Sequence, residues 1–246
     1  MNSLKGKIII VTGGNGLLGK ELIIKINENA GFSINLDINH ETTDDLSLIK
    51  CDITKTSDVI SAIEKIVIKY KKIDCLVNNA YPRTKDWGLK FEDIPIESWK
   101  LNVDFQLNSY FFISQTVSKQ MLLSNSGSIV NIASIYGVVG PDFNIYEGTS
   151  MTMPAAYSAI KGGLISFTKY LASYLGPNNI RVNAVSPGGI FDNQNPIFVN
   201  NYNNKVPLRR MGNPDDIIPA IIFLLSEDAK YITGQNLIID GGWTSI

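Results

Sequence analysis

The stretch Lys7-Ile-Ile-Ile-Val-Thr-Gly-Gly-Asn-Gly-Leu-Leu-Gly19 joins a β-type run to a glycine-rich turn and the start of a helical pattern. A dinucleotide-binding turn requires this context of strand, turn and helix. Glycine permits the tight turn and lets the backbone approach a pyrophosphate, while free NH groups at the helix N-terminus attract negative charge. The stretch therefore predicts a phosphate-binding turn, with a plain structural turn as the alternative. The candidate cofactor-binding residues here are Gly13, Asn15, Gly16, Leu17, Leu18 and Gly19.

Short β-rich runs alternate with helical stretches along the rest of the chain. The β-rich runs are Lys7–Thr12, Phe32–Ile38, Ser47–Ile53, Asp74–Asn78, Ser128–Ala133, Arg181–Ser186 and Asn236–Asp240. Apolar residues at helical spacing occupy Leu17–Asn29, Thr56–Lys71, Ser98–Leu123, Ala156–Leu175 and Asp215–Leu225. This alternation predicts an α/β protein, a Rossmann-like doubly wound parallel sheet of about seven strands with helices on both faces. We expect residues 1–246 to form a single domain, since no repeat or linker divides them.

The charge balance argues against polyanionic partners. The chain has 22 Lys and Arg against 23 Asp and Glu, a net charge of −1, so it has no net positive field to hold nucleic acid or an anionic membrane surface. The longest nearly apolar run, Ile217–Leu225, is too short for a membrane span and contains Pro219. The N-terminus has no signal-peptide pattern, so we expect a cytoplasmic protein.

The cysteine and histidine content excludes two kinds of site. Cys51 and Cys75 lie 24 residues apart without a CxxC motif, and His40 is the only histidine. Neither a zinc site nor a histidine-based nucleophilic triad can be assembled from these residues, so no metal is expected. We expect both cysteines to be ordinary reduced strand residues and His40 to be an exposed loop residue.

Asp37 lies at the end of the second β-rich run, 18 residues after Gly19. A carboxylate at this position accepts hydrogen bonds from the ribose hydroxyls of an adenosine and repels a 2′-phosphate. Ile38, which follows it, adds no positive charge. The pair predicts NAD(H) rather than NADP(H) as the cofactor, although a helix cap or an exposed turn residue would also place an aspartate here.

Seven short motifs occur in an order that resembles the short-chain dehydrogenase/reductase family, in its single-domain branch. They are Thr12-Gly13 with Gly16 and Gly19, Asp52, Asn78-Asn79-Ala80, Asn131-Ile-Ala-Ser134, Tyr157-Ser-Ala-Ile-Lys161, Pro187-Gly188 and Asp240-Gly-Gly. The resemblance covers essentially the whole chain. It implies that Asp52 and Ile53 contact adenine and that Asn79 and Ala80 lie along the adenosine ribose. It also implies that Pro187, Gly188 and Ile190 hold the nicotinamide carboxamide.

The catalytic residues are expected around Tyr157. A tyrosine hydroxyl, with a reference pKa near 10, is a poor base at neutral pH unless a positive charge stabilises its phenolate. Lys161 lies one helical turn away on the same face, although such a pair taken alone is usually a surface feature. The resemblance assigns Tyr157 as general acid/base, Lys161 as its activator and a ligand of the nicotinamide ribose, and Ser134 as the hydroxyl that orients the substrate oxygen.

The chain departs from the family pattern at three places. The spacing of Gly13, Gly16 and Gly19 is that of a longer branch that acts on nucleotide-linked sugars. The fourth catalytic position, an asparagine in the family, is Gln106 here, and Asn102 is the nearest asparagine; a Gln106 amide can still bind a water chain toward Lys161. Asp192 replaces a threonine that commonly follows the Pro-Gly pair.

Two segments carry substrate clues. Ser134 and Tyr157 are 23 residues apart, and the extra chain, Pro141–Pro154, offers Tyr146 and Glu147 to a sugar, unless it is only a surface loop. The stretch Phe191–Arg210 is rich in Asn and Gln, which favours a polar, polyhydroxylated substrate. Arg83, just after Asn79-Ala80, is either a phosphate clamp or part of a solvated basic turn.

The same segments look like one subgroup of the family, the flagellin-modification reductases associated with bacterial surface sugars of the nonulosonic acid kind. The resemblance implies an NAD(H)-dependent oxidoreductase that interconverts a hydroxyl and a carbonyl on a sugar phosphate or sugar nucleotide. The alternatives are a sugar epimerase or dehydratase that recycles its NAD, and a non-enzymatic NAD-binding regulatory protein. Aromatic residues on Ser98–Leu123 and Ala156–Leu175 predict a homodimer or homotetramer.

Overall fold

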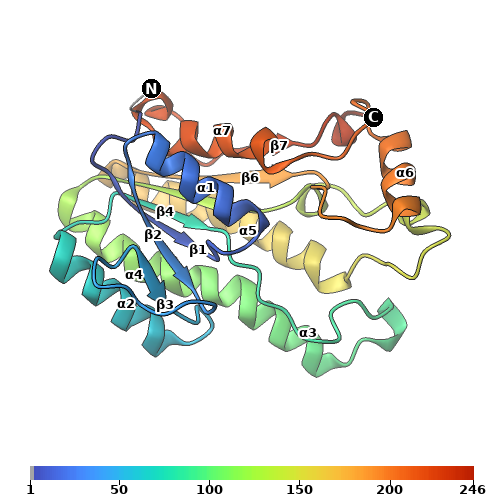
Figure 1. The fold of residues 1–246 in the computed structure, drawn as a ribbon, viewed down its shortest axis with the longest axis horizontal. Coiled ribbons are helices and arrows are strands. Elements are labelled where there is room, and N and C mark those ends of the chain that lie inside the picture. Colours follow the sequence, from blue (N-terminus) through green and yellow to red (C-terminus); the bar gives the residue numbers. More distant parts are fainter. Residues whose placement is uncertain (1–2) are drawn as a thin grey trace.

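The computed structural model describes residues 3–246, whose strands form one parallel sheet (Figure 1). The strands are β1 (Ile8–Thr12), β2 (Phe32–Asp37), β3 (Leu48–Lys50), β4 (Cys75–Asn78), β5 (Gly127–Ile132), β6 (Ile180–Pro187) and β7 (Asn236–Ile239). They lie in the order β3-β2-β1-β4-β5-β6-β7. The α/β fold with a doubly wound, seven-stranded parallel sheet is therefore confirmed.

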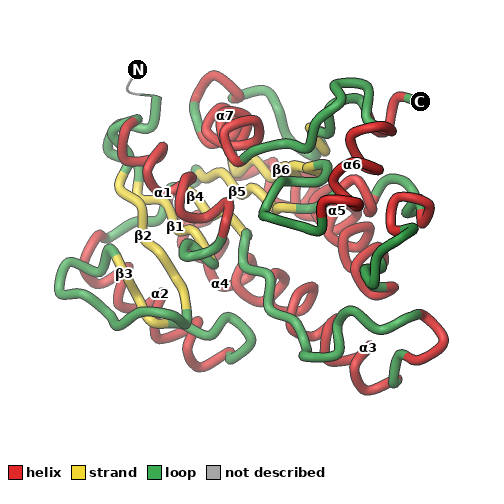
Figure 2. Tube along the Cα trace, turned by 45° about the vertical axis from the view of Figure 1, so that its right-hand side comes forward, coloured by secondary structure: helices red, strands yellow, loops and turns green. Residues whose placement is uncertain are grey.

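Helices cover both faces of the sheet, as Figure 2 also shows. They are α1 (Leu17–Glu28), α2 (Thr56–Tyr70), α3 (Ile96–Val103), α4 (Ser109–Ser124), α5 (Ala155–Leu175), α6 (Pro196–Lys205) and α7 (Pro214–Leu225). α1 and α7 pack on one face around Ile9 and Val11, and α2, α4 and α5 pack on the other around Ile10 and Leu76. Because both faces are covered, β1 is buried along its length, which explains its unbroken apolar run.

The predicted helix Ser98–Leu123 is a composite. α3 passes into a π-helical turn at Asp104–Asn108, which continues directly into α4. A wide turn of this kind inside a helix often marks a functional position. The periodicity of the apolar residues does not reveal such a turn, because it shifts their register by only one residue.

Helix α6 is not among the helical stretches predicted from the sequence. The Asn195 side chain accepts a hydrogen bond from Ile197 N at 2.8 Å, and Pro196 occupies the first helical turn. Phe198 and Tyr202, four residues apart, are buried and attach this helix to the protein. The capping signal was present in the sequence, but the low apolar content of the segment obscured it.

The sheet reverses its strand order between β1 and β4, and a polar clasp joins these two strands at their carboxyl ends. The Thr12 hydroxyl accepts hydrogen bonds from Asn79 N and Ala80 N, at 2.9 and 3.0 Å. The Asn79 amide donates in return to the carbonyls of Thr12 and Gly13. A reversal of strand order is where sheets of this type bind ligands, so the clasp fixes the floor of the expected site.

The structure also tests the smaller expectations. Cys51 and Cys75 are free and buried, and burial raises the pKa of each thiol to about 12. Cys75 lies in β4 as expected, but Cys51 follows β3 and does not lie in it.

His40 is half-buried, and its Nδ1 lies 3.3 Å from Asn15 Nδ2. The expectation that His40 is an exposed residue was therefore wrong. Within residues 3–246 there is no helix long and apolar enough to cross a membrane, and no cluster of metal-binding side chains.

Candidate active site

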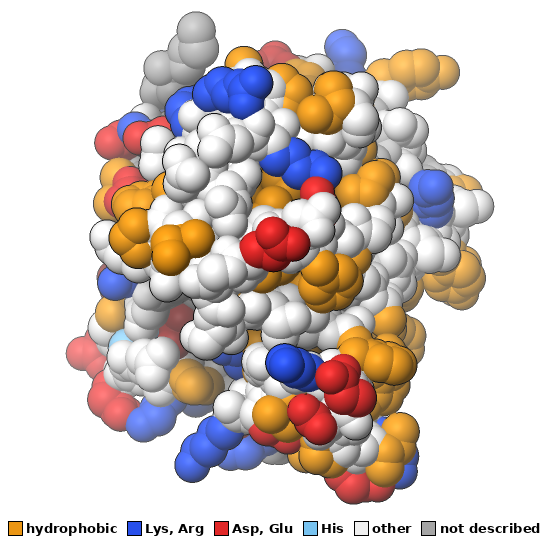
Figure 3. All heavy atoms as spheres, turned by 90° about the vertical axis from the view of Figure 1, so that its right-hand side faces the viewer, with side chains coloured by type: hydrophobic (Ala, Val, Ile, Leu, Met, Phe, Trp, Pro, Cys, Tyr) orange, Lys and Arg blue, Asp and Glu red, His pale blue; other side chains and the backbone are white. Residues whose placement is uncertain are grey.

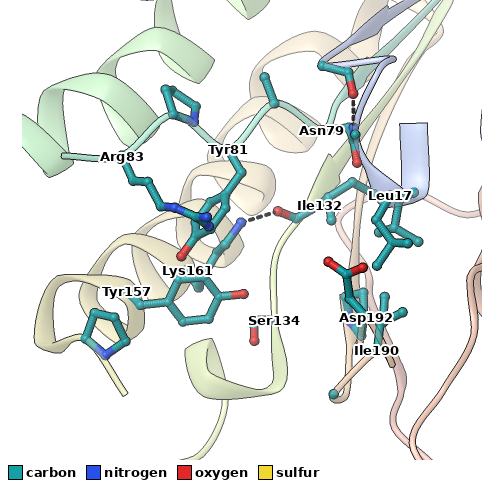
Figure 4. A pocket seen from close by; sticks show the side chains of 18 of the residues that line it. Leu17, Asn79, Tyr81, Arg83, Ile132, Ser134, Tyr157, Lys161, Ile190 and Asp192 are labelled. Atoms are coloured by element: carbon teal, nitrogen blue, oxygen red, sulfur yellow. Dashed lines mark hydrogen bonds between the residues drawn. The ribbon is translucent and has the colours of Figure 1, made fainter. Parts of the chain in front are cut away.

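A cleft of about 830 Å³ lies along the carboxyl ends of the central strands, which point toward the side of the molecule shown in Figure 3. Figure 4 shows how its walls approach each other from the phosphate-binding turn, the segment after β4, α5 and the loop after β6. The candidate cofactor residues that line it are Gly13, Asn15, Gly16, Leu17, Leu18, Asp37, Ile38, Asp52, Ile53, Asn79, Ala80, Tyr157, Lys161, Pro187, Gly188 and Ile190. The structure thus brings together residues that lie up to 177 positions apart, from Gly13 to Ile190.

The glycine turn has the shape that close approach of a phosphate group requires. Gly13 has a positive φ of +66°, and a Cβ there would lie 2.7 Å from the Cα of Ala80. Gly19 does not line the cleft; a Cβ on it would lie 2.3 Å from the carbonyl oxygen of Gly13, so its role is to let α1 pack against the turn. Glycine therefore lets the turn pack closely against Ala80 and against α1, where a side chain would collide with the backbone. The turn leads directly into the N-terminus of α1, whose free NH groups fit the pyrophosphate of a dinucleotide.

Asp37 is part of a hydrogen-bonded network behind this turn. Its two carboxylate oxygens accept from Asn15 N at 3.0 Å and from Asn39 N at 2.9 Å. Asn35, which the sequence analysis missed, accepts from Gly14 N and donates to Asn15 Oδ1. The only signal for Asn35 was an amide inside an otherwise apolar strand. The network holds the Asp37 carboxylate at the cleft with lone pairs still free to accept from a ribose.

Ser134, Tyr157 and Lys161 converge at one end of the cleft (Figure 4). The Lys161 ammonium donates to the carbonyl of Ile132 at 2.8 Å and lies 5.5 Å from the centroid of the Tyr157 ring. Burial raises the pKa of Tyr157, while a hydrogen bond with Ser134 acts in the opposite direction. Burial also lowers the pKa of Lys161 to about 7. The three side chains have the arrangement that proton transfer at a substrate oxygen needs.

Aromatic rings that the sequence analysis did not identify surround this end of the cleft. The rings of Tyr81, Trp87 and Tyr157 meet edge to face, with centroids 5.7 to 6.2 Å apart. The Lys161 ammonium lies 5.7 Å from the Tyr81 centroid and 6.0 Å from that of Tyr110, whose hydroxyl donates to the carbonyl of Ala80. These rings fix Tyr157 in place and exclude water from the ammonium.

Gln106 and Asn102 have different surroundings. Gln106 lies in the π-helical turn, is buried, and neither of its amide atoms has a hydrogen-bond partner within residues 3–246. It does not line the cleft. The Asn102 amide is bound on both its oxygen and its nitrogen, because it accepts from Thr84 N and donates to Thr84 Oγ1 and the carbonyl of Ser98. Asn102 therefore positions the segment after β4 and is not free for a relay.

The insertion Pro141–Pro154 is fastened to α6. The rings of Tyr146 and Phe198 stack with centroids 5.3 Å apart, Lys205 pairs with Asp142, and the Asn201 amide donates to the carbonyls of Ile145 and Glu147. The cleft is lined by four consecutive residues of the insertion, Met151, Thr152, Met153 and Pro154, and by Tyr146. The insertion is thus a wall of the cleft and not only a surface loop.

One substrate expectation needs correction. The Glu147 side chain is exposed and lies outside the cleft, while the Asn201 amide binds the Glu147 backbone carbonyl. The Asn-rich segment contributes both polar and aromatic side chains to the cleft. Asp192, Gln194, Phe198 and Tyr202 line the cleft, whereas Asn201 binds the insertion. Composition alone did not show which of these residues line the cleft, because a helix presents only one of its faces to a site.

The low pKa of Lys161 predicts a pH-dependent stability. In the unfolded chain a lysine has a pKa of about 10.4, so between pH 7 and 10 the unfolded state binds more protons than the folded state. Stability therefore rises with pH across this window. Between pH 7 and 9 the free energy of unfolding of the cofactor-free wild type should increase by roughly 1–3 kcal/mol more than that of Lys161→Met. The Tm of the wild type should accordingly rise by several degrees relative to the variant. Parallel Tm profiles of the two proteins from pH 6.5 to 9.5 would contradict this prediction.

Comparison with known proteins gives concordant matches. The family described as enoyl-(acyl carrier protein) reductase matches residues 19–244. A post-translational flagellin modification protein A of Campylobacter coli is 37% identical over 98% of this chain and 99% of its own length. A 3-oxoacyl-(acyl-carrier-protein) reductase of Chlamydia muridarum is 34% identical over 98% of this chain and 99% of its own. The crystal structure of a short-chain dehydrogenase from Leptospira borgpetersenii with bound NAD+ superposes with a TM-score of 0.89 at 38% identity, covering 98% and 94% of the two chains.

Proposed function

The chain belongs to the short-chain dehydrogenase/reductase family, and on that premise we propose that it interconverts a hydroxyl and a carbonyl on a sugar-type substrate with NAD(H). The observation that carries the proposal is the convergence of Ser134, Tyr157 and Lys161 in the cleft that the glycine turn also lines. The flagellin-modification relative supports a substrate of surface-glycan biosynthesis. Aromatic rings in the substrate half of the cleft suit the C–H faces of a sugar ring.

Each residue has a distinct part in this proposal. The dinucleotide supplies hydride transfer, which is the cofactor's own chemistry. Ser134 hydrogen-bonds the substrate oxygen, Tyr157 exchanges the proton at that oxygen, and the Lys161 charge favours the phenolate form of Tyr157. Gln106, whose buried amide has unused hydrogen-bonding capacity within residues 3–246, would bind a water on the path that supplies protons to Lys161.

The proposal predicts net reduction of NAD. When the purified protein is given NAD and a panel of neutral sugars, sugar phosphates and nucleotide sugars, absorbance at 340 nm should rise as NADH forms with at least one of them. Tyr157→Phe should lower turnover by roughly 10²–10⁴-fold and should still bind NAD. Lys161→Met should impair both turnover and binding. Near-native turnover in Tyr157→Phe would contradict the assignment. An epimerase or dehydratase that recycles its cofactor would convert the sugar without net NADH, so product analysis by NMR separates that alternative.

We further propose that NAD(H) is preferred to NADP(H), because the Asp37 carboxylate at the cleft faces no basic neighbour within 4.0 Å in the described part of the chain. NADH should bind at least about tenfold more tightly than NADPH. Asp37→Asn removes the negative charge but keeps an oxygen that can accept from the backbone NH of Asn15 or Asn39. It should therefore bring the dissociation constants of NADH and NADPH closer together while the glycine turn keeps its structure. Fluorescence titration measures both constants, and equal binding to the wild type would refute the preference.

We also propose that the protein forms a homodimer or homotetramer through α4 and α5. Four rings on these helices lie side by side as an aromatic strip, with centroids 5.9 to 6.5 Å apart: Phe111, Phe167, Tyr170 and Tyr174. Tyr170 and Tyr174 are 62% and 66% exposed. Tyr110, one of the aromatic residues in the predicted helix Ser98–Leu123, is instead buried in the core. Exposed rings in such number favour an interface.

Light scattering should accordingly give a mass that is a multiple of 27.1 kDa. Tyr170→Lys combined with Tyr174→Lys places like charges in the aromatic strip and should reduce the assembly toward the monomer, whereas Tyr231→Lys, at a fully exposed ring elsewhere, is the matched control. A wild type that remains monomeric at assay concentration would refute the assembly.

A further inference from the structure

We propose that Arg83 binds an anionic group of the substrate, a phosphate or a carboxylate, beside the reacting end of the cleft. The inference rests on the proposed function, because it names the substrate class for the same site. Sequence alone left Arg83 equally open to a role in a solvated basic turn. The structure provides four observations that favour a binding role.

The first observation is that the backbone around Arg83 is fixed. The segment leaves β4 at the clasp between Thr12 and Asn79, and two residues beyond Tyr81 it presents Arg83. Directly afterwards, Thr84 is held by the buried Asn102 amide, with Thr84 N donating to Asn102 Oδ1 at 3.1 Å and Asn102 Nδ2 donating to Thr84 Oγ1 at 2.8 Å. Because these anchors already hold the backbone on both sides of Arg83, only the Arg83 side chain has to be ordered when a ligand binds.

The second observation is the direction of the side chain. The Arg83 guanidinium carbon lies 5.3 Å from the centroid of the Tyr81 ring, and Tyr81 in turn meets Tyr157 edge to face at 5.7 Å. In Figure 4 the Arg83 side chain extends from its loop toward Tyr81 and Tyr157, and Arg83 lines the cleft. Arg83 and Lys85 are both exposed, but Lys85 does not line the cleft. Only one of these two basic side chains therefore faces the site.

The third observation is that the Arg83 charge is uncompensated. No carboxylate lies within 4.0 Å of its guanidinium in residues 3–246. Asp192, the acidic residue of this part of the cleft, lies across from it, near Leu17 and Ile190 (Figure 4). Lys161 donates to Ile132 and has a pKa of about 7, so Arg83 supplies the permanent positive charge at this end. A guanidinium binds phosphate or carboxylate oxygens by two parallel hydrogen bonds.

The fourth observation is the distance. The Arg83 guanidinium carbon lies 5.3 Å from the Tyr81 ring centroid, which lies 5.7 Å from the Tyr157 ring centroid. The guanidinium carbon is therefore at most about 11 Å from the centre of the Tyr157 ring. The anionic group and the reacting carbon therefore belong to one molecule of monosaccharide size. The 830 Å³ cleft must also hold the dinucleotide, which favours a sugar phosphate or sugar acid over a nucleotide-linked sugar.

The test is calorimetric titration of the full chain saturated with NADH. Hexoses and pentoses are each used in three matched forms: neutral sugar, terminal phosphate and aldonate. The ligand that binds most tightly should be an anionic form. Its dissociation constant should be lower than that of its neutral parent by about tenfold or more. The phosphate and aldonate arms show which anion is the natural one, and inorganic phosphate or sulfate should compete with it.

Matched variants assign the effect to Arg83. Arg83→Gln should weaken the anionic form about tenfold or more while NADH and the neutral parent stay within about twofold. Arg83→Lys, which keeps the charge but loses the planar fork, should lie between the two. Lys85→Gln, which removes a positive charge outside the cleft, should change none of these constants, so it separates a local contact from a general loss of positive charge.

The proposal is overturned if the neutral sugars bind as tightly as their anionic forms, or if Arg83→Gln leaves the anionic advantage intact. It is also overturned if no anionic form in the panel binds. Failure of the proposed function has a different signature. In that case no sugar yields NADH with the wild type, whereas binding of an anion to the NADH complex, and its loss in Arg83→Gln, remain measurable without any turnover.

Discussion

The hydrogen bonds between Thr12 and Asn79 hold the functional half of the molecule together. They tie the carboxyl ends of β1 and β4 at the point where the sheet reverses its strand order, and each strand then delivers one wall of the cleft. β1 leads into the glycine turn, and β4 leads into the segment that carries Tyr81 and Arg83. Behind the clasp the Asn78 amide donates to Ser114 and Asn131, so polar groups cross an otherwise apolar sheet with their donors satisfied. The relative position of cofactor turn and substrate wall thus depends on a few buried polar contacts.

The burial of Lys161 is the main electrostatic cost of the site. An ammonium in a low-dielectric environment loses hydration, and this loss lowers the pKa of Lys161. The carbonyl of Ile132 and the surrounding rings of Tyr81, Tyr110 and Tyr157 offset part of it. In the proposed mechanism the same low dielectric would make a protonated Lys161 more effective on the neighbouring phenol, because its charge would be poorly screened there. The feature that destabilises the cofactor-free fold would then also prepare Tyr157 for proton transfer.

The sequence was sufficient for features that depend on local pattern, and insufficient for those that depend on which face a segment presents. Alternation of β-rich and helical stretches predicted the sheet, and the spacing of Tyr157 and Lys161 placed them on one helix face. The π-helical turn around Gln106 was not predictable, because apolar periodicity tolerates one extra residue. Glu147 was misplaced because its orientation depends on the distant Asn201. Tyr81 was passed over because its contacts with Trp87 and Tyr157 join segments whose proximity only the folded chain reveals.

The residues that could be predicted from the sequence lie mostly on the sheet and α5, whereas those that could not lie mostly in the segments around the substrate half of the cleft. In the proposed function, proton transfer and cofactor binding rest on strand ends and on α5, which pack against or belong to the sheet. The substrate half of the cleft rests on the segment after β4, on the insertion before α5 and on α6. These segments contact one another through side chains such as Tyr146 and Phe198, and they contribute little to the sheet. They can change in sequence without disturbing the hydride-transfer geometry. Relatives named for flagellin modification and for acyl-carrier-protein reduction can accordingly share one framework, and in this chain the charge of Arg83 and the rings of Tyr81 and Tyr146 are the features of the substrate half on which our proposals rest.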